Sequence, residues 1–143
     1  ASPKIWIQQS RKEQWHWLEE SKQVNWNLSK QANIGDLLLM YRCYPAKIIK
    51  EIYIVIGEKS RGRASYKDGY CNFALIRQLC KLDSPLFLDD MRNHNILKTS
   101  SFVRCNMQGF LLVSEYWPYL YEMILRRNPK VRKLLSDYMP EKL

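Results

Sequence analysis

The stretch Gly35-Asp36-Leu37-Leu38-Leu39-Met40-Tyr41-Arg42-Cys43-Tyr44 decides the fold, because a turn signal precedes an apolar strand that ends at Pro45. Residues 47–58 follow and are rich in β-branched and aromatic side chains, the composition typical of a buried strand. Only Pro45-Ala46 separates the two runs. We therefore expect a hairpin of these two strands.

Working outward toward the N-terminus, residues 4–9 form a short run of bulky side chains that predicts a first strand. Ser10 and Glu13 have the spacing of a capping box, so a short helix is expected through residues 15–19. Residues 21–31 show no clean period and are interpreted as irregular.

Toward the C-terminus, residues 57–69 are polar and predict a loop, and residues 70–82 return to strand character. Ser84-Pro85 has the pattern of a helix start. The remaining expected elements are a helix over 86–92, strands over 102–105 and 109–113, and helices over 115–127 and 130–138. This order predicts an α+β fold, a mixed and partly closed β-barrel of five to six strands with surrounding helices.

Composition indicates one folded, basic domain. The chain has 143 residues, of which 46% are hydrophobic and 13% aromatic, which suits a single domain over 1–143 and argues against disorder. Its 23 Lys and Arg against 14 Asp and Glu give a net charge of +9, spread along the sequence. Such a surface attracts polyanions, which favours nucleic-acid binding over a merely solvated basic surface.

The sequence lacks the motifs that carry metal or nucleophilic chemistry. The four cysteines form no C-x-x-C pair and the two histidines are far apart, so we expect no metal and no cofactor. No nucleophile elbow, P-loop or dinucleotide fingerprint occurs. We therefore expect a protein that is not an enzyme and that has reduced cysteines inside the cell. No apolar run exceeds five residues, so no membrane partner is expected.

Two aromatic segments leave alternatives open. Trp26 lies between Asn25 and Asn27 and either fills the core or forms a wall on which a nucleobase stacks. The segment from Arg61 to Tyr66 is either a solvated hairpin tip or a surface that contacts phosphate and supplies a second aromatic wall.

The whole pattern resembles a known family. The similarity is carried by the Trp-Asn of residues 26–27, the 35–42 stretch, the strand over 48–57, Ser84-Pro85-Leu86-Phe87-Leu88, Met107-Gln108-Gly109-Phe110, and Trp117 with Arg127-Asn128-Pro129. Together these motifs resemble the EVE domain of the PUA-like superfamily, which also contains the YTH domains. The resemblance implies a PUA-like barrel that reads a modified nucleobase flipped into an aromatic pocket. For EVE domains the base is modified cytosine in DNA, and for YTH domains it is N6-methyladenine.

Carried onto this sequence, the resemblance implies a base pocket and a phosphate-contacting surface. The first strand would place Gln8, Gln9 and Ser10 at the pocket edge. The expected base-pocket residues are Trp26, Asn27, Tyr66, Ser10, Gln9 and Gln108, and the expected phosphate contacts are Arg42, Arg61, Arg63 and Lys67.

The resemblance also implies partners and a setting. DNA carrying a modified base such as 5-methylcytosine or 5-hydroxymethylcytosine is the first expectation, ahead of RNA. EVE domains occur fused to nuclease or AAA+ motor modules in restriction systems, so we expect a domain excised from a longer protein. In a prokaryote it would be cytoplasmic and nucleoid-associated. The alternatives are a YTH-like reader of N6-methyladenine in DNA or RNA, and a basic protein-interaction module.

Overall fold

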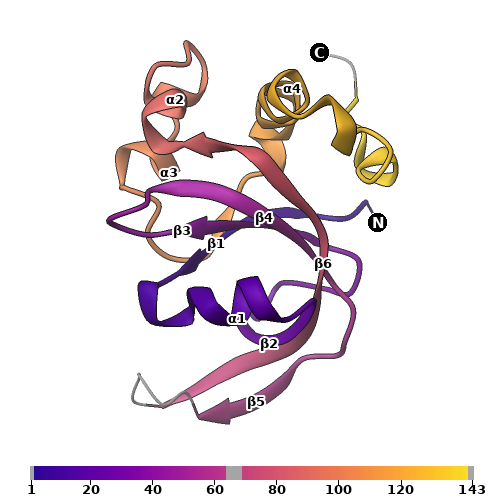
Figure 1. The fold of residues 1–143 in the computed structure, drawn as a ribbon. Helices are drawn as coiled ribbons and strands as arrows, with labels where there is room; N and C mark the ends of the chain where they lie inside the picture. The colour runs from indigo at the N-terminus through magenta and orange to yellow at the C-terminus, as the bar shows by residue number, and fades with distance from the viewer. Residues whose placement is uncertain (1, 64–68, 142–143) are drawn as a thin grey trace.

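A computed structural model describes residues 2–63 and 69–141. Within them, seven strands form one mixed sheet in the order β2-β6-β4-β3-β1-β7, with β5 paired to β6 (Figure 1). The strands are β1 (Ile5–Ser10), β2 (Gln23–Leu28), β3 (Leu37–Arg42), β4 (Ile48–Val55), β5 (Ser60–Arg63), β6 (Tyr70–Phe87) and β7 (Leu111–Leu112). The α-helices are α1 (Trp15–Glu20), α2 (Leu88–Arg92), α3 (Ser101–Arg104) and α4 (Trp117–Arg127).

The predicted hairpin is confirmed, and it lies in the middle of the sheet. β3 and β4 pair antiparallel from Leu37↔Ile54 to Arg42↔Ile48, and β1 pairs parallel to the other edge of β3. Every residue of β3 is buried, as expected for a strand covered on both faces of a sheet. The apolar run that begins at Leu37 is therefore uninterrupted because neither face meets water.

The sheet carries a separate core on each face. Side chains alternate along β3, so Leu39 packs with the helices α2, α3 and α4, while Leu38 and Met40 pack with Trp6 and Trp26. Figure 1 shows α2 and α4 above strands β3 and β4, with α1 and the edge strand β2 below them. We call the lower core, which contains Trp6 and Trp26, the tryptophan core.

The expectation that residues 21–31 are irregular is wrong, because most of this segment forms strand β2. It pairs antiparallel with β6 in a register that sets Trp26 opposite Ala74. Val24, Trp26 and Leu28 point toward the core in alternation with exposed or half-buried polar residues. The alternation of apolar and polar residues typical of a strand was therefore present in the sequence. Asn25 and Asn27, which are uncommon in strands, made it hard to recognise.

Four other local expectations are also wrong. The chain remains extended through Ser84-Pro85, and α2 begins only at Leu88. The Asn128 side chain explains this, since its Oδ1 accepts from the Ser84 N–H and its Nδ2 donates to the Ser84 carbonyl, both at 2.9 Å. Residues 102–105 lie mainly in helix α3, and the expected last helix is two 3₁₀ turns, Pro129–Val131 and Ser136–Tyr138. The polar 57–69 segment contains strand β5.

The α+β class and the mixed sheet are confirmed, but the sheet has more strands than expected and is not closed into a barrel. Among the described residues, β2 and β7 end the sheet without pairing to each other. No described helix has both the length and the apolar character that a membrane crossing requires.

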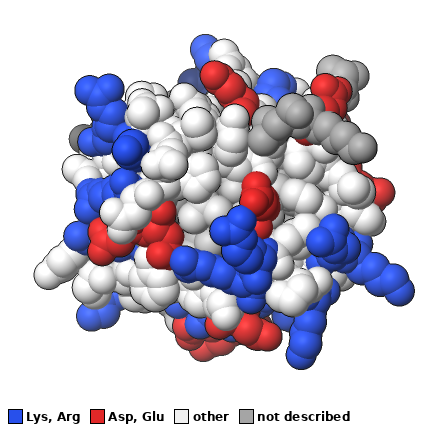
Figure 2. Space-filling model, turned by 90° about the horizontal axis from the view of Figure 1, so that it is seen from above, with Lys and Arg blue, Asp and Glu red and all other residues white. Residues whose placement is uncertain are grey.

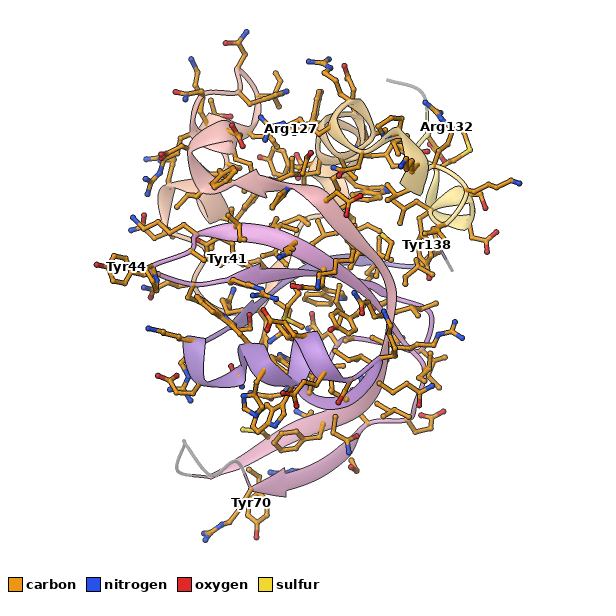
Figure 3. All side chains as sticks on the ribbon, in the orientation of Figure 1. Tyr41, Tyr44, Tyr70, Arg127, Arg132 and Tyr138 are labelled. Carbon is orange, nitrogen blue, oxygen red and sulfur yellow. The ribbon has the colours of Figure 1, made fainter. Side chains whose placement is uncertain are left out.

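One ion pair ties α2 to α4. The Asp90 carboxylate accepts from the Arg127 guanidinium at 2.6 Å and from the Phe87 N–H at 2.8 Å (Figure 3 labels Arg127). The hydrogen bond from Arg127 lowers the pKa of Asp90 more than its partial burial raises it. A carboxyl with a lowered folded-state pKa stabilises the fold above its unfolded pKa, and this contribution disappears as the pH falls through the lowered value.

We predict that Asp90→Asn lowers the free energy of unfolding by about 0.5–1 kcal/mol at pH 7, a value discounted for the partial exposure of the pair. The difference from wild type should begin to shrink as the pH falls below about 4 and vanish below the lowered folded-state pKa, where the wild-type carboxyl is uncharged like the asparagine. Urea unfolding at pH 7 and pH 3 measures it. Asp89→Asn on the same helix is the control, because Asp89 is exposed and lies 3.6 Å from Arg92. An equal penalty at both pH values would contradict the prediction.

Candidate functional site

A pocket of about 310 Å³ opens where the sheet stays unclosed. β7 pairs only with Trp6 and Ile7 of β1, so no strand lies along this edge of β1 beyond Ile7 among the described residues. The end of β1, the turn into α1, strand β2 and the segment before β7 line the space. The lining residues are Gln8, Gln9, Arg11, Gln14, Trp26, Asn27, Gly109 and Phe110. We call this space the seam pocket.

Trp26 fills the core and lines the pocket at the same time. It is only 4% exposed and belongs to the tryptophan core, yet it borders the seam pocket. The indole N–H groups of Trp6 and Trp117 donate to Asp36 and to the Tyr138 carbonyl. The Trp26 indole has no such acceptor among the described residues. Most of the ring is thus structural, and the remaining surface is available to a ligand.

Gln9 brings an unsatisfied donor to this pocket. Its side-chain Nε2 is buried and has no hydrogen-bond partner among the described residues. A buried polar group without a partner costs about 1–3 kcal/mol, so such groups are rare in folded proteins. An amide in this state is ready to bind a ligand that carries an acceptor.

A second pocket of about 560 Å³ adjoins the seam pocket and shares Gln9, Arg11 and Gly109 with it. It lies beside the turn between β3 and β4. The other lining residues are Tyr41, Cys43, Tyr44, Lys47, Leu88, Asn106, Met107 and Gln108. We call it the hairpin pocket. Burial raises the pKa of Tyr41 to about 12, so its hydroxyl keeps its proton at neutral pH and can donate.

The expected base-pocket residues are only partly brought together. Gln9, Trp26 and Asn27 line the seam pocket, whereas Gln108 lines the hairpin pocket. Ser10, contrary to expectation, lines neither, because its buried hydroxyl donates to the Tyr41 carbonyl at 3.0 Å. It does not cap the following helical turn either. That turn is preceded by Arg11, whose N–H donates to the Gln14 side chain at 2.8 Å.

Two of the expected phosphate contacts lie on β5. The guanidinium carbons of Arg61 and Arg63 stand 5.3 and 5.7 Å from the centre of the Tyr70 ring. Figure 3 shows Tyr70 at the far end of the β5–β6 hairpin. Tyr66 and Lys67, the expected second wall and a further phosphate contact, lie outside the described residues.

Arg42 is a structural ion-pair residue rather than a phosphate contact, contrary to expectation. Its guanidinium is buried and bonds Glu51 through two nitrogens, at 3.2 and 2.6 Å, and Glu19 at 3.1 Å. Burial alone lowers the pKa of Arg42, but the hydrogen bonds and charges of both glutamates raise it overall. The same contact with Arg42 lowers the pKa of Glu19.

Sequence reasoning missed three lining side chains, Arg11, Gln14 and Phe110. Phe110 had a usable signal, because a large aromatic residue that follows a glycine with φ of +87° is placed by a turn rather than by a core. Arg11 and Gln14 had none, since they read as ordinary polar residues of a helix start.

Two further features of the described residues concern surface charge and possible metal ligands. Figure 2 shows the helical side of the molecule, where basic side chains are interspersed with acidic and uncharged ones. Among the residues that the structure describes, no group of His, Cys, Asp or Glu is arranged to hold a metal ion. Both pockets present aromatic rings, amides and cations, and the hairpin pocket also contains the Cys43 thiol.

Comparisons with known proteins support the fold. A hypothetical protein from Leishmania major superposes with a TM-score of 0.70 at 13% identity, covering 87% of this chain and 96% of that one. A Rhodopseudomonas palustris protein solved by NMR gives 0.65 at 15% identity over 89% and 94% of the two chains. An Agrobacterium tumefaciens protein gives 0.61 at 16% identity over 97% and 96%. No protein-family model and no curated protein matches the chain. Identities this low establish a shared fold alone.

The buried ion pair gives a test of the role of Arg42. We predict that Arg42→Met lowers the free energy of unfolding by about 3–5 kcal/mol, because Glu51 is fully buried and would keep an uncompensated charge. The double variant Arg42→Met/Glu51→Leu should recover most of the loss. Denaturant unfolding of the two single variants and the double variant measures it.

The same double variant separates structure from binding. If Arg42 only pairs with glutamates, the salt dependence of oligonucleotide binding should match that of wild type. A folded double variant with a shallower salt slope would return Arg42 to the phosphate contacts.

Proposed function

We propose that this protein is a nucleic-acid reader that holds a flipped, modified nucleobase in the seam pocket. The base is a modified cytosine in DNA, such as 5-methylcytosine or 5-hydroxymethylcytosine. The observation that carries the proposal is the unpartnered Gln9 amide beside Trp26 in an open pocket. The choice of cytosine rests on the resemblance to EVE domains given above.

The size and lining of the pocket suit one planar group. Its volume of about 310 Å³ lies at the low end of the roughly 300–1,000 Å³ typical of ligand pockets. Trp26 supplies an indole surface, and Phe110, which is 42% exposed, supplies a second aromatic ring. Stacking of a base on an aromatic side chain contributes roughly 1–3 kcal/mol and offsets the few kcal/mol that flipping costs.

Amides provide the means of reading the edge of a base. Gln8, Gln9, Gln14 and Asn27 all line the pocket. Each amide carries both a donor and an acceptor, so a set of them can match the mixed edge of cytosine. Binding of a base would give the Gln9 Nε2 the acceptor that the protein itself does not provide. Hydrogen bonds must supply most of the specificity, because one buried methyl group contributes only about 0.8 kcal/mol.

Arg61 and Arg63 of β5, which we call the basic arm, lie near the pocket along the sheet. In the sheet, Asn27 of β2 is opposite Phe73 of β6, and Ser60 of β5 is opposite the same Phe73. Arg61 and Arg63 therefore lie one and three residues further along the β5–β6 hairpin from the row that contains Asn27. This arm can contact the phosphates of a strand whose base occupies the seam pocket. Tyr66 and Lys67 continue as candidates in the adjoining part of the chain.

We predict that Gln9→Met weakens binding to an oligonucleotide with one modified cytosine by about five- to thirtyfold, because one hydrogen bond to the base is lost. Binding to the same oligonucleotide with plain cytosine should change much less. Tryptophan fluorescence during titration of matched duplexes and single strands measures both affinities.

Gln23→Met is the matched control, because Gln23 is an exposed amide on β2 that lines neither pocket. Equal wild-type affinity for plain cytosine, 5-methylcytosine, 5-hydroxymethylcytosine and N6-methyladenine would overturn the reader function. A preference for N6-methyladenine would instead establish the YTH-like alternative. Binding that is only non-specific would favour the protein-interaction module.

For the basic arm, we predict that the pair of substitutions Arg61→Gln and Arg63→Gln weakens binding to modified and plain duplexes alike. The slope of log K against log salt should fall in magnitude by about 1.8, or roughly 0.9 per lost phosphate contact. Lys98→Gln with Lys130→Gln removes the same charge from exposed positions that line neither pocket and serves as the control. A change that depends on the modification would contradict a pure phosphate role.

A further inference from the structure

We propose that the hairpin pocket binds the nucleotide adjacent to the flipped base on the same strand. In this arrangement Arg11 and Lys47 contact the intervening phosphate and Tyr44 stacks on the neighbouring base. The inference rests on the proposed function, because it extends the ligand of the seam pocket by one nucleotide.

The two pockets form one continuous surface. They share Gln9, Arg11 and Gly109, so a strand with one nucleotide in the seam pocket reaches the hairpin pocket directly. Gln9, whose buried Nε2 has no partner among the described residues, lines both pockets. A phosphodiester that crosses from one pocket to the other would pass the side chains of Gln9 and Arg11.

The charge of the hairpin pocket fits a phosphate. Arg11 and Lys47 line it, and its lining contains no carboxylate among the described residues. Asn106, also in the lining, accepts at 2.5 Å from the guanidinium of Arg92, whose charge is paired with Asp89 at 3.6 Å, so the positive charge available to a phosphate is that of Arg11 and Lys47. This part of the protein therefore has a locally positive surface in a molecule whose helical face is mixed in charge.

Tyr44 has the geometry of a stacking platform. It is 77% exposed, and Figure 3 shows it projecting from the turn between β3 and β4, while Tyr41 lies further inside. The Lys47 ammonium stands 5.7 Å from the centre of the Tyr44 ring. A base placed on this ring would have the ammonium close to its phosphate. Aromatic rings serve in this way in single-strand binding proteins because every base has a face that stacks.

The test compares ligands of increasing length. The probes are 5-methyl-2′-deoxycytidine, which has no phosphate, and dinucleotides that carry 5-methylcytosine on the 5′ or the 3′ side. Tyr44→Ala should weaken binding of one of the two dinucleotides by about five- to tenfold and leave nucleoside binding unchanged. Tyr44→Phe, which keeps the ring, should behave like wild type. Amide shifts in ¹H–¹⁵N spectra measure each affinity and locate each ligand.

Lys47→Gln tests the phosphate contact separately. It should reduce the magnitude of the salt slope for the dinucleotide by about 0.7, the value for one contact in a single strand, and leave the nucleoside unaffected. Lys130→Gln, in the turn Pro129–Val131 after α4, is the control for loss of charge alone. It should leave the salt slope unchanged.

The outcomes distinguish this inference from the proposed function. If wild type prefers modified ligands but neither Tyr44→Ala nor Lys47→Gln changes dinucleotide binding, the hairpin pocket proposal fails and the reader stands. If plain and modified ligands bind equally, and both variants weaken them equally, the reader fails and the hairpin pocket remains a nucleotide site. Absence of binding by every ligand would overturn both proposals.

Discussion

The site depends on how little of β1 is paired on its outer edge. β7 covers only Trp6 and Ile7, so the sheet ends at that edge just where β1 continues to Gln8 and Gln9. From the other side, β2 brings Trp26 into the same core as Trp6. The two ends of the sheet share a core without sharing hydrogen bonds. The seam pocket is the space that this incomplete closure leaves, and its walls are held by a core on each face of the sheet.

This arrangement explains how one residue can serve both stability and binding. Trp26 is almost fully buried, and truncating a buried tryptophan typically costs about 3–5 kcal/mol. The indole cannot move without disturbing the tryptophan core, so its pocket surface is fixed before any ligand arrives. Preorganisation of this kind reduces the ordering cost of binding. It also means that polar side chains such as Gln9 are the better positions at which to test function without unfolding the protein.

Sequence patterns predicted the parts of the fold that local physics decides. The β3–β4 hairpin follows from the apolar run of β3 and the isoleucine-rich run of β4, and α4 follows from Pro118 in its first turn. Strand β2 and the extended Ser84 needed partners distant in the chain, namely β6 and Asn128. The residues of the candidate site also fall into those that local sequence predicts and those that only the folded chain brings together. Trp26 and Gln9 could be predicted from motifs, whereas Arg11 and Gln14 enter the pocket only through topology. Arg42 looked like a free cation until the hairpin placed Glu51 against it.

Among the described residues, the Gln9 amide and the Tyr53 and Tyr121 hydroxyls are buried without a hydrogen-bond partner, and of these three residues only Gln9 lines the seam and hairpin pockets. A buried donor without an acceptor destabilises the folded state by roughly 1–3 kcal/mol, and an apolar side chain of similar length would avoid that cost. Ser10, the neighbour of Gln9 in the strand, donates its hydroxyl to the Tyr41 carbonyl. A buried polar side chain at this end of β1 can therefore find a hydrogen-bond partner within the protein. A ligand acceptor between the two pockets would return to Gln9 the hydrogen bond that folding removes from water. Under the proposed function, the fold leaves this polar group unsatisfied so that a ligand can supply its hydrogen bond.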